Sequence, residues 1–300
     1  MNLKNDLKHL DVDVEEHKDL SSFSTMRLKA KGTLITVRSS NALEEMLKIF
    51  SSKKQNYQIL GMGANTLLSE NSEVPYISLK FKFDKESLVD DGKDFVLPAS
   101  LRLSTLTSFA VKNNLKGWEV FTGVPASLGG AVVMNAGTSL GEIGDLVKRV
   151  WIVQKNGETK TIDIDENSFT YRKNNFLNDG DVIYQVEIKN LGKDEKVSEV
   201  IRNYLKKRND SQPMKEWTCG CVFKNSSFNE NPCPAGKYID IIGLKGLSIG
   251  DMRISDVHGN FFENTGSSTR EDVLELIMLA KEELYLQFGV NFELEARIEE

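Results

Sequence analysis

The sequence has no long apolar segment and few residues that could form cross-links. Its longest apolar runs, such as 131–134 and 276–280, are far shorter than the roughly 18 residues that a membrane-spanning helix needs. Only three cysteines are present, and Cys219 and Cys221 are separated by a single residue, which does not suggest a disulfide framework. Residues 1–20 mix charges of both signs and contain no apolar core typical of a secretory signal. We therefore expect a cytoplasmic protein that does not contact membranes.

The chain also lacks an excess of basic residues. It contains 38 Lys and Arg against 44 Asp and Glu, a formal net charge of -6, which argues against nucleic acid as a partner. At 300 residues, with 40% hydrophobic and 27% charged residues, the composition is that of a globular protein with two or three compact units.

Periodic apolar residues predict a mixture of helices and short strands. A helix is expected over 41–55, where apolar residues recur at i, i+3, i+4 and i+7. A second helix is expected to begin after Ser104, which would cap it, and a third from about residue 197. A fourth is expected to begin at Thr269, which forms a capping box with Asp272, and to end at Gly289. Strands are predicted at 34–37, 57–60, 76–79, 95–98, 150–153, 159–162, 182–188 and 290–299. This pattern predicts an α+β fold.

Two polar stretches suggest boundaries between domains. Residues 84–94 are acidic and contain glycine, and residues 192–196 read Gly-Lys-Asp-Glu-Lys. We therefore expect three domains, at 1–82, 83–194 and 195–300.

A glycine-containing turn follows the predicted strand at 57–60. It reads Gly61-Met62-Gly63-Ala64-Asn65-Thr66, and its backbone amides could surround a phosphate. The third glycine of the G-x-G-x-x-G dinucleotide fingerprint is replaced by Thr66. Taken alone, such a segment is more often an ordinary tight turn than a phosphate site.

A second glycine-rich segment begins at Thr122 and continues to Asn135-Ala136-Gly137. Pro125 fixes one backbone angle, Ser127 can cap a short helix, and Gly129-Gly130 allow close packing, so the helix start could hold a diphosphate. Close packing of helices inside the core also selects small residues, and this alternative stays open.

Other residues have both a chemical and a structural interpretation. The fork-shaped side chain of Arg172, next to Tyr171, suits a carboxylate, although most arginines simply lie at the surface. Gly220 could direct the thiol of Cys221 into a cleft, or the thiol could be buried. By pattern alone, Glu295 is one of several charges on a solvated strand face.

A zinc site would need the three cysteines and His258. Cys219 and Cys221 are separated by one residue and no second cysteine pair follows, unlike the usual zinc knuckle, so we expect no metal.

Taken in order, these segments resemble the UDP-N-acetylenolpyruvoylglucosamine reductase (MurB) family. The resemblance is collinear over most of the chain and is carried by the segments 23–28, 60–65, 123–131, 134–137, 171–172, 212–213, 220–225, 235–237, 243–246, 258–261, 264–266 and 293–295. The interval from Arg172 to Pro213 looks too short for the additional tyrosine-bearing loop of longer members, which implies the shorter subtype.

The resemblance implies a fold, a cofactor and a reaction. The fold has two FAD-binding domains of the vanillyl-alcohol oxidase type and a C-terminal α+β substrate-binding domain, whose final strand returns Glu295 to the active site. The implied enzyme is a UDP-N-acetylmuramate dehydrogenase of peptidoglycan synthesis. NADPH, as co-substrate, gives hydride to FAD, which reduces the enolpyruvyl group of a UDP-sugar.

The resemblance also implies roles for individual residues. Arg172 and Glu295 stabilise negative charge developing on the substrate, and Glu295 must hold or share a proton to do so. Cys221 stands where most members have a serine and donates a proton. Tyr171 and Asn225 bind substrate. The residues implied to bind FAD are Gly61, Met62, Gly63, Ala64, Asn65, Thr66, Gly123, Val124, Pro125, Ser127, Gly129, Gly130, Asn135 and Gly137.

Several positions depart from the usual family pattern. Asn174 stands where a serine usually follows the Tyr-Arg pair, and Ala126 precedes Ser127 where glycine is usual.

We expect a monomer. The alternatives are another FAD-dependent oxidoreductase with a different substrate and, from a different class, a zinc-stabilised binding module.

Overall fold

The computed structural model describes residues 2–228 and 231–299, and the chain divides into two compact units. Unit 1 contains the segment up to Glu16 together with 33–62 and 73–205. Unit 2 contains 17–32, 63–72 and the segment from Lys206 onward. Both units mix helices and strands, which confirms the α+β expectation. The three domain boundaries expected from the sequence stay predictions.

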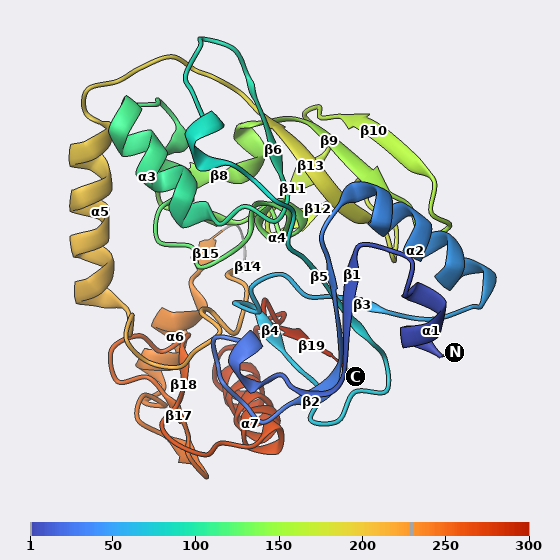
Figure 1. The fold of residues 1–300 in the computed structure, drawn as a ribbon. Helices are drawn as coiled ribbons and strands as arrows, with labels where there is room; N and C mark the ends of the chain where they lie inside the picture. Colours follow the sequence, from blue (N-terminus) through green and yellow to red (C-terminus); the bar gives the residue numbers. More distant parts are fainter. Residues whose placement is uncertain (1, 229–230, 300) are drawn as a thin grey trace. The chain divides into compact units, whose positions relative to one another are not determined.

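One sheet of unit 1 packs against the amphipathic helix α2 (Ser40–Ser52), and Leu7 of the short helix α1 joins the same core (Figure 1). The strands have the order β1-β2-β5-β3, and β5 pairs in parallel with β2 and β3. The helix predicted over 41–55 is confirmed as α2, capped by the Ser39 hydroxyl, which accepts from the Ala42 amide at 3.3 Å. The elements are α1 (Leu3–Leu7), β1 (Val12–Asp19), β2 (Lys31–Val37), α2 (Ser40–Ser52), β3 (Gln58–Ile59) and β5 (Tyr76–Leu79).

A second sheet of unit 1 is antiparallel, with the order β10-β9-β13-β6. Its core centres on Trp118, which is fully buried, with ring centroids 4.8 Å from Phe95 and 5.4 Å from Phe121. The indole N–H donates to the Lys189 carbonyl at 3.2 Å, so the polar end of the ring is also satisfied. The elements are β6 (Phe95–Pro98), α3 (Leu103–Asn113), α4 (Leu128–Val133), β9 (Val147–Val153), β10 (Thr159–Asp163) and β13 (Val182–Ile188). The helix α5 (Val197–Ser211) begins in unit 1 and ends in unit 2.

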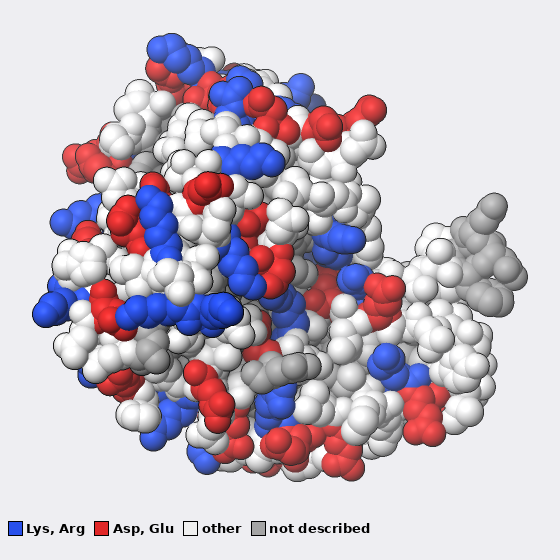
Figure 2. Space-filling model, turned by 90° about the vertical axis from the view of Figure 1, so that its right-hand side faces the viewer, with Lys and Arg blue, Asp and Glu red and all other residues white. Residues whose placement is uncertain are grey.

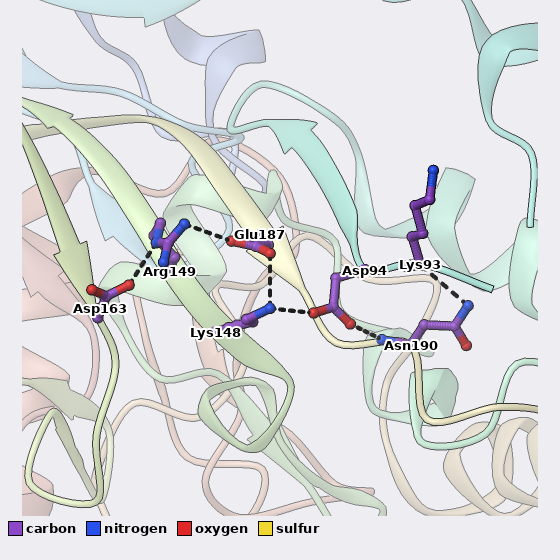
Figure 3. A network of polar contacts seen from close by, with 7 residues as sticks. All are labelled: Lys93, Asp94, Lys148, Arg149, Asp163, Glu187 and Asn190. Atoms are coloured by element: carbon purple, nitrogen blue, oxygen red, sulfur yellow. Dashed lines mark hydrogen bonds and ion pairs between the residues drawn. The ribbon is translucent and has the colours of Figure 1, made fainter. Parts of the chain in front are cut away.

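A network of charged side chains crosses this second sheet (Figure 3). Lys148 Nζ lies 2.6 Å from Asp94 and 3.2 Å from Glu187. Arg149 contacts Glu187 at 3.5 Å and Asp163 at 2.5 Å. The hydrogen bond from Lys148 is the main cause that lowers the pKa of the Asp94 carboxyl. The network connects β9, β10 and β13 to the start of β6.

Unit 1 also contains two very short hairpins and several single turns of 3-10 helix. The hairpins are β7 (Gly137–Thr138) with β8 (Gly141–Glu142), and β11 (Phe169–Thr170) with β12 (Lys173–Asn174). The 3-10 turns in this unit are Lys85–Ser87, Trp118–Phe121 and Ile143–Asp145.

Unit 2 packs a long helix, α7, against a three-stranded antiparallel sheet of order β16-β17-β18. The predicted capping box of Thr269 and Asp272 is confirmed, as is the end of α7 at Gly289, which has φ +66°. The elements of this unit are β4 (Thr66–Leu67), β14 (Ser226–Phe228), β15 (Asn231–Cys233), α6 (Ala235–Ile241), β16 (Ser248–Ile249), β17 (Met252–Ile254), β18 (Phe262–Asn264), α7 (Arg270–Phe288) and β19 (Arg297–Ile298), with a 3-10 turn at Ser21–Phe23.

Two local predictions are wrong. Ser104 does not cap α3, because the helix already begins at Leu103, whose amide donates to the Ala126 carbonyl at 3.0 Å. The predicted strand 290–299 is regular only at Arg297–Ile298 (β19), which pairs in parallel with β4. Before β19 the chain is extended and makes single contacts, such as the bridge between Leu294 and Phe223, in place of a continuous ladder.

Charges of both signs are interspersed on the side of the molecule drawn in Figure 2. Blue Lys and Arg atoms lie among red Asp and Glu atoms, and no large area of a single sign is visible there. This mixture agrees with the net charge of -6 and gives no support to a nucleic-acid interface on that side.

Replacing Gly157, in the turn between β9 and β10, is predicted to destabilise the protein. A Cβ atom there would lie 2.3 Å from Lys48 Cγ and 2.7 Å from the Lys48 amide nitrogen on α2, at a φ of +85°. The clash and the left-handed backbone together should lower the free energy of unfolding of Gly157→Ala by about 2–5 kcal/mol. Urea denaturation of the two proteins measures this difference.

Gly92→Ala is the matched control. Its φ is +82°, but no atom lies within 4 Å of the added Cβ, so only the backbone cost of about 1–2 kcal/mol is expected. Equal losses in the two variants would contradict close packing of α2 against the β9–β10 turn.

His258 should make unit 2 sensitive to acid. Its ring packs on Phe261 at 4.9 Å, its Nδ1 accepts from the Asn260 amide, and burial lowers its pKa below 6.5. The unfolded chain therefore takes up the proton first, and the stability that the neutral ring contributes is lost as the pH falls below 6.5. Melting temperatures between pH 7.5 and 5.5 should fall less for His258→Gln than for the wild type. The same change at the exposed His9 should leave the wild-type slope unaltered.

Candidate active site

The glycine-rich segment after Thr122 forms the short helix α4 and the loop before it. The predicted cap is confirmed, because the Ser127 hydroxyl accepts from the Gly130 amide at 3.3 Å. The Leu128 amide donates to the Leu101 carbonyl and the Gly129 amide to the Ala99 carbonyl, both at 2.8 Å. A Cβ on Gly129 would lie 2.8 Å from the Ala99 Cβ, so the start of α4 packs directly on the residue that follows β6.

The turn after β3 lies next to this helix start within unit 1. A Cβ at Gly61 would be 3.1 Å from Ser127 Oγ, so the two glycine-containing segments approach each other with little side-chain bulk between them. Gly123, before α4, has φ +74°, which favours glycine. Bare backbone at two adjoining turns is the arrangement that holds the phosphates of a dinucleotide, so these residues fit FAD.

The remainder of the first turn belongs to unit 2. Gly63 has φ +61°, and a Cβ there would lie 2.1 Å from the Phe23 carbonyl oxygen, so no other residue fits. The side chain of Asn65 donates from Nδ2 to the Glu295 carbonyl at 2.8 Å, and its own carbonyl accepts from the Arg297 amide. Asn65 thus connects the predicted cofactor turn to the C-terminal segment that carries Glu295.

Arg172 lies at the tip of the β11–β12 hairpin in unit 1. Tyr171 and Arg172 form its two-residue turn, and the guanidinium lies 5.3 Å from the centroid of the Tyr171 ring. Arg172 has φ +56°, a left-handed conformation that costs about 1–3 kcal/mol for a residue with a side chain. Such strain is retained where the surrounding structure enforces it, often at functional sites.

Asn135 holds the β11–β12 hairpin and the loop of Glu142 and Gly144 in place through its side chain. Only 1% of its surface is exposed. Its Nδ2 donates to the Glu142 carboxylate at 2.7 Å and to the Thr170 carbonyl at 3.1 Å, and its Oδ1 accepts from the Gly144 amide at 3.0 Å. Both donor hydrogens are therefore used within the protein. The sequence placed Asn135 among the cofactor-binding residues and gave no sign of these bonds.

Gly137 lies against the side chain of Arg172. A Cβ on Gly137 would lie 3.0 Å from an Arg172 terminal nitrogen and 2.9 Å from Glu142 Cγ. The guanidinium thus passes close to bare backbone, as the absence of a side chain at this position permits.

Cys221 and Glu295 are brought together in unit 2. The carbonyl of Val222, the residue after Cys221, accepts from the amides of Glu295 at 2.8 Å and Ala296 at 3.2 Å. Cys221 is partly exposed, whereas Cys219 is buried. Burial first, and then the neighbouring Cys221 and Glu295, raise the pKa of the Cys219 thiol to about 12. Cys219 therefore stays protonated at neutral pH.

Asn260 forms hydrogen bonds to Val222 and Phe223, the two residues after Cys221. It was not among the predicted site residues. Its Oδ1 accepts from the Phe223 amide at 2.9 Å, its Nδ2 donates to the Phe223 carbonyl at 2.8 Å, and its carbonyl accepts from the Val222 amide. The signal that could have identified it is its place in the His-Gly-Asn-Phe segment 258–261, which carries part of the family resemblance, since its burial is known only from the structure. Asn225, predicted to bind substrate, accepts through Oδ1 from the Ala235 amide at 3.1 Å, which fixes the orientation of its side-chain amide.

The structure does not assemble the alternative zinc site. Within residues 2–228 and 231–299, no three His, Cys, Asp or Glu side chains are grouped closely enough to hold a metal ion. In the same part of the chain, no helix is long and apolar enough to cross a membrane.

Comparisons with known proteins agree on one family. Residues 212–299 match the model of the UDP-N-acetylenolpyruvoylglucosamine reductase C-terminal domain, and residues 33–163 match an FAD binding domain. The reductases of Alkaliphilus oremlandii and Chloroherpeton thalassium are each 32% identical to this chain, over 85% and 95% of it and 83% and 93% of their own lengths. The crystal structure of the reductase (MurB) from Thermus caldophilus superposes with a TM-score of 0.79 at 30% identity, covering 96% of this chain and 98% of that one.

These matches extend over nearly the whole chain and include both the FAD-binding region and the C-terminal region that carries Cys221 and Glu295. The chain therefore belongs to the UDP-N-acetylenolpyruvoylglucosamine reductase family.

Proposed function

We propose that this protein catalyses the NADPH-dependent reduction of UDP-N-acetylglucosamine enolpyruvate to UDP-N-acetylmuramate in peptidoglycan precursor synthesis. The observation that carries this conclusion is the match to curated UDP-N-acetylenolpyruvoylglucosamine reductases over 95% of the chain. The protein is accordingly an FAD-dependent oxidoreductase. When bound, FAD would supply the hydride chemistry between NADPH and the enolpyruvyl group.

The residues proposed to hold FAD are those of the two glycine-containing segments. Their short side chains let the main chain approach phosphate oxygens, and Ser127 fixes the start of α4 beside Gly61. Because the first three amides of α4 already donate within the protein, the amides proposed to bind phosphate are those of the turn 61–66 and of Gly123 and Val124. The proposed set is Gly61, Met62, Gly63, Ala64, Asn65, Thr66, Gly123, Val124, Pro125, Ser127, Gly129, Gly130, Asn135 and Gly137. Because the side-chain hydrogens of Asn135 are used within the protein, its contribution is to the shape of the site.

Arg172 is proposed to stabilise the substrate carboxylate, with Tyr171 and Asn225 binding the substrate. When hydride adds to the terminal methylene carbon of the enol ether, negative charge develops toward the carboxylate, and the fixed charge of a guanidinium favours this transition state. Glu295 assists only if it is protonated or shares a proton with that carboxylate.

Cys221 is proposed to donate the proton that completes the reduction. The proton moves from Sγ to the second carbon of the former double bond, and the resulting thiolate is reprotonated from solvent. A thiol with a usual pKa of about 8.5 is a much stronger acid than the serine found in most members, so it can donate readily near neutral pH. Activity should decline once alkaline pH removes this proton.

Further aspects of the proposal concern the whole chain. We place the domains at 1–82, 83–194 and 195–300 and propose a monomer that works in the cytoplasm. The three cysteines are thiols and form no disulfide, as is usual in a reducing compartment.

Removing the Cys221 thiol should separate the two half-reactions. In Cys221→Ala, NADPH should be oxidised at the wild-type rate within about twofold, while reduction of the enolpyruvyl sugar nucleotide should fall by about 100-fold or more, because a general acid contributes that much. Cys221→Ser should recover most of this loss. Stopped-flow absorbance under anaerobic conditions measures each half-reaction separately.

Cys219→Ala is the control for this experiment, since it makes the same change two residues away, at a buried thiol. We expect both of its half-reactions to stay within about threefold of wild type. If Cys221→Ala lost both half-reactions equally, Cys221 would not be the proton donor.

A further inference from the structure

The hairpin that carries Arg172 is too short to fix its own position. β11 and β12 contribute two residues each, and the turn between them consists only of Tyr171 and Arg172. An isolated two-stranded hairpin is marginally stable at best, and this one also contains a left-handed residue at its tip. Contacts outside the hairpin must therefore hold Arg172 in place.

Phe169 of β11 packs against the core, and two asparagine side chains add a hydrogen bond to each strand. Asn135 donates to the carbonyl of Thr170 on β11 at 3.1 Å. Asn174, on β12, donates from Nδ2 to the carbonyl of Val133 at 2.8 Å. The Oδ1 atom of Asn174 accepts from the Leu177 amide at 3.0 Å, so its amide group is oriented from both ends.

Both hydrogen bonds connect the hairpin to the C-terminal end of α4. Val133 is the last residue of this helix, and Asn135 follows two residues later. The opposite end of α4 is fixed by the Ser127 cap and by close contact of Gly129 with Ala99. A single six-residue helix thus connects the loop proposed to hold FAD to the hairpin that carries Arg172.

We propose that Asn174 is a positioning residue for Arg172 in this enzyme. Its hydrogen bond to Val133 fixes the second strand of the hairpin to α4 and thereby sets the guanidinium relative to the group bound at the other end of that helix. Both printed bonds of the Asn174 side chain are to main-chain atoms, the Val133 carbonyl and the Leu177 amide, so its role is to position Arg172. This inference rests on the proposed function, because it assumes that Arg172 acts on the enolpyruvyl substrate.

Variants that remove the bond from Asn174 to the Val133 carbonyl distinguish this role from general support of the hairpin. Asn174→Asp keeps an oxygen that accepts from Leu177 but has no hydrogen to donate to Val133. Asn174→Ala loses both bonds without adding a charge, so the two variants separate loss of the bond from the effect of the charge.

Asn175→Asp is the matched control. Asn175 is the next residue, is exposed, and donates from Nδ2 to the Asn167 carbonyl within the loop that leads into the hairpin, with no bond to α4. It therefore introduces the same chemical change one residue away.

The test measures anaerobic half-reactions of the FAD-loaded proteins and hydrogen–deuterium exchange of the same proteins without FAD. In both Asn174 variants, NADPH oxidation should stay within about twofold of wild type, while kcat/KM for the enolpyruvyl substrate should fall about tenfold or more. Amides in 169–176 should exchange faster than in wild type, and those of α2 should be unchanged. Asn175→Asp should resemble wild type in both half-reactions.

Other results would overturn the inference. Wild-type kcat/KM in both Asn174 variants would show that the bond to Val133 does not position Arg172, and equal loss of both half-reactions would show general structural damage. Failure of the wild-type protein to reduce the enolpyruvyl substrate would refute the proposed function, and the inference with it. A normal wild type with unaffected Asn174 variants would refute the inference alone.

Discussion

The proposed chemistry of unit 1 depends most on the hydrogen bonds of the Asn135 side chain. Two donors and one acceptor on one buried amide connect the end of α4, the loop of Glu142 and Gly144, and the hairpin of Arg172. Leaving such groups buried without partners costs about 1–3 kcal/mol each, so the three segments are coupled. The same connection explains how a strained arginine conformation persists.

Unit 2 uses a similar device around Cys221. Asn260 makes two side-chain bonds and one backbone bond to Val222 and Phe223, and the Val222 carbonyl accepts from Glu295 and Ala296. A buried asparagine thus fixes the segment that carries the thiol, while the C-terminal segment is held by these backbone bonds and by the Asn65 side chain, which donates to the Glu295 carbonyl. In both units, rigid main chain presents the reactive group, and the neighbouring buried amide does no chemistry.

Local signals predicted the elements well, and non-local contacts explain the failures. The apolar spacing in α2 and the Thr269–Asp272 box identify helices because their causes lie within one or two turns. Ser104 failed as a cap because pairing of Leu103 with Ala126 begins the helix earlier. The segment 290–299 alternates like a strand, but its partners are scattered. The bonds of Asn135, Asn174 and Asn260 join distant residues, and a single sequence contains no sign of them.

The most direct measurement is the visible spectrum of the protein loaded with FAD under anaerobic conditions, first with NADPH and then with UDP-N-acetylglucosamine enolpyruvate. The account predicts that the flavin absorbance bleaches on addition of NADPH and returns in stoichiometric proportion to the enolpyruvyl substrate, with UDP-N-acetylmuramate as product. Bleaching followed by no response to that substrate would contradict the proposed reaction while leaving the FAD-binding fold in place. Absence of bound flavin after incubation with FAD would contradict the site itself.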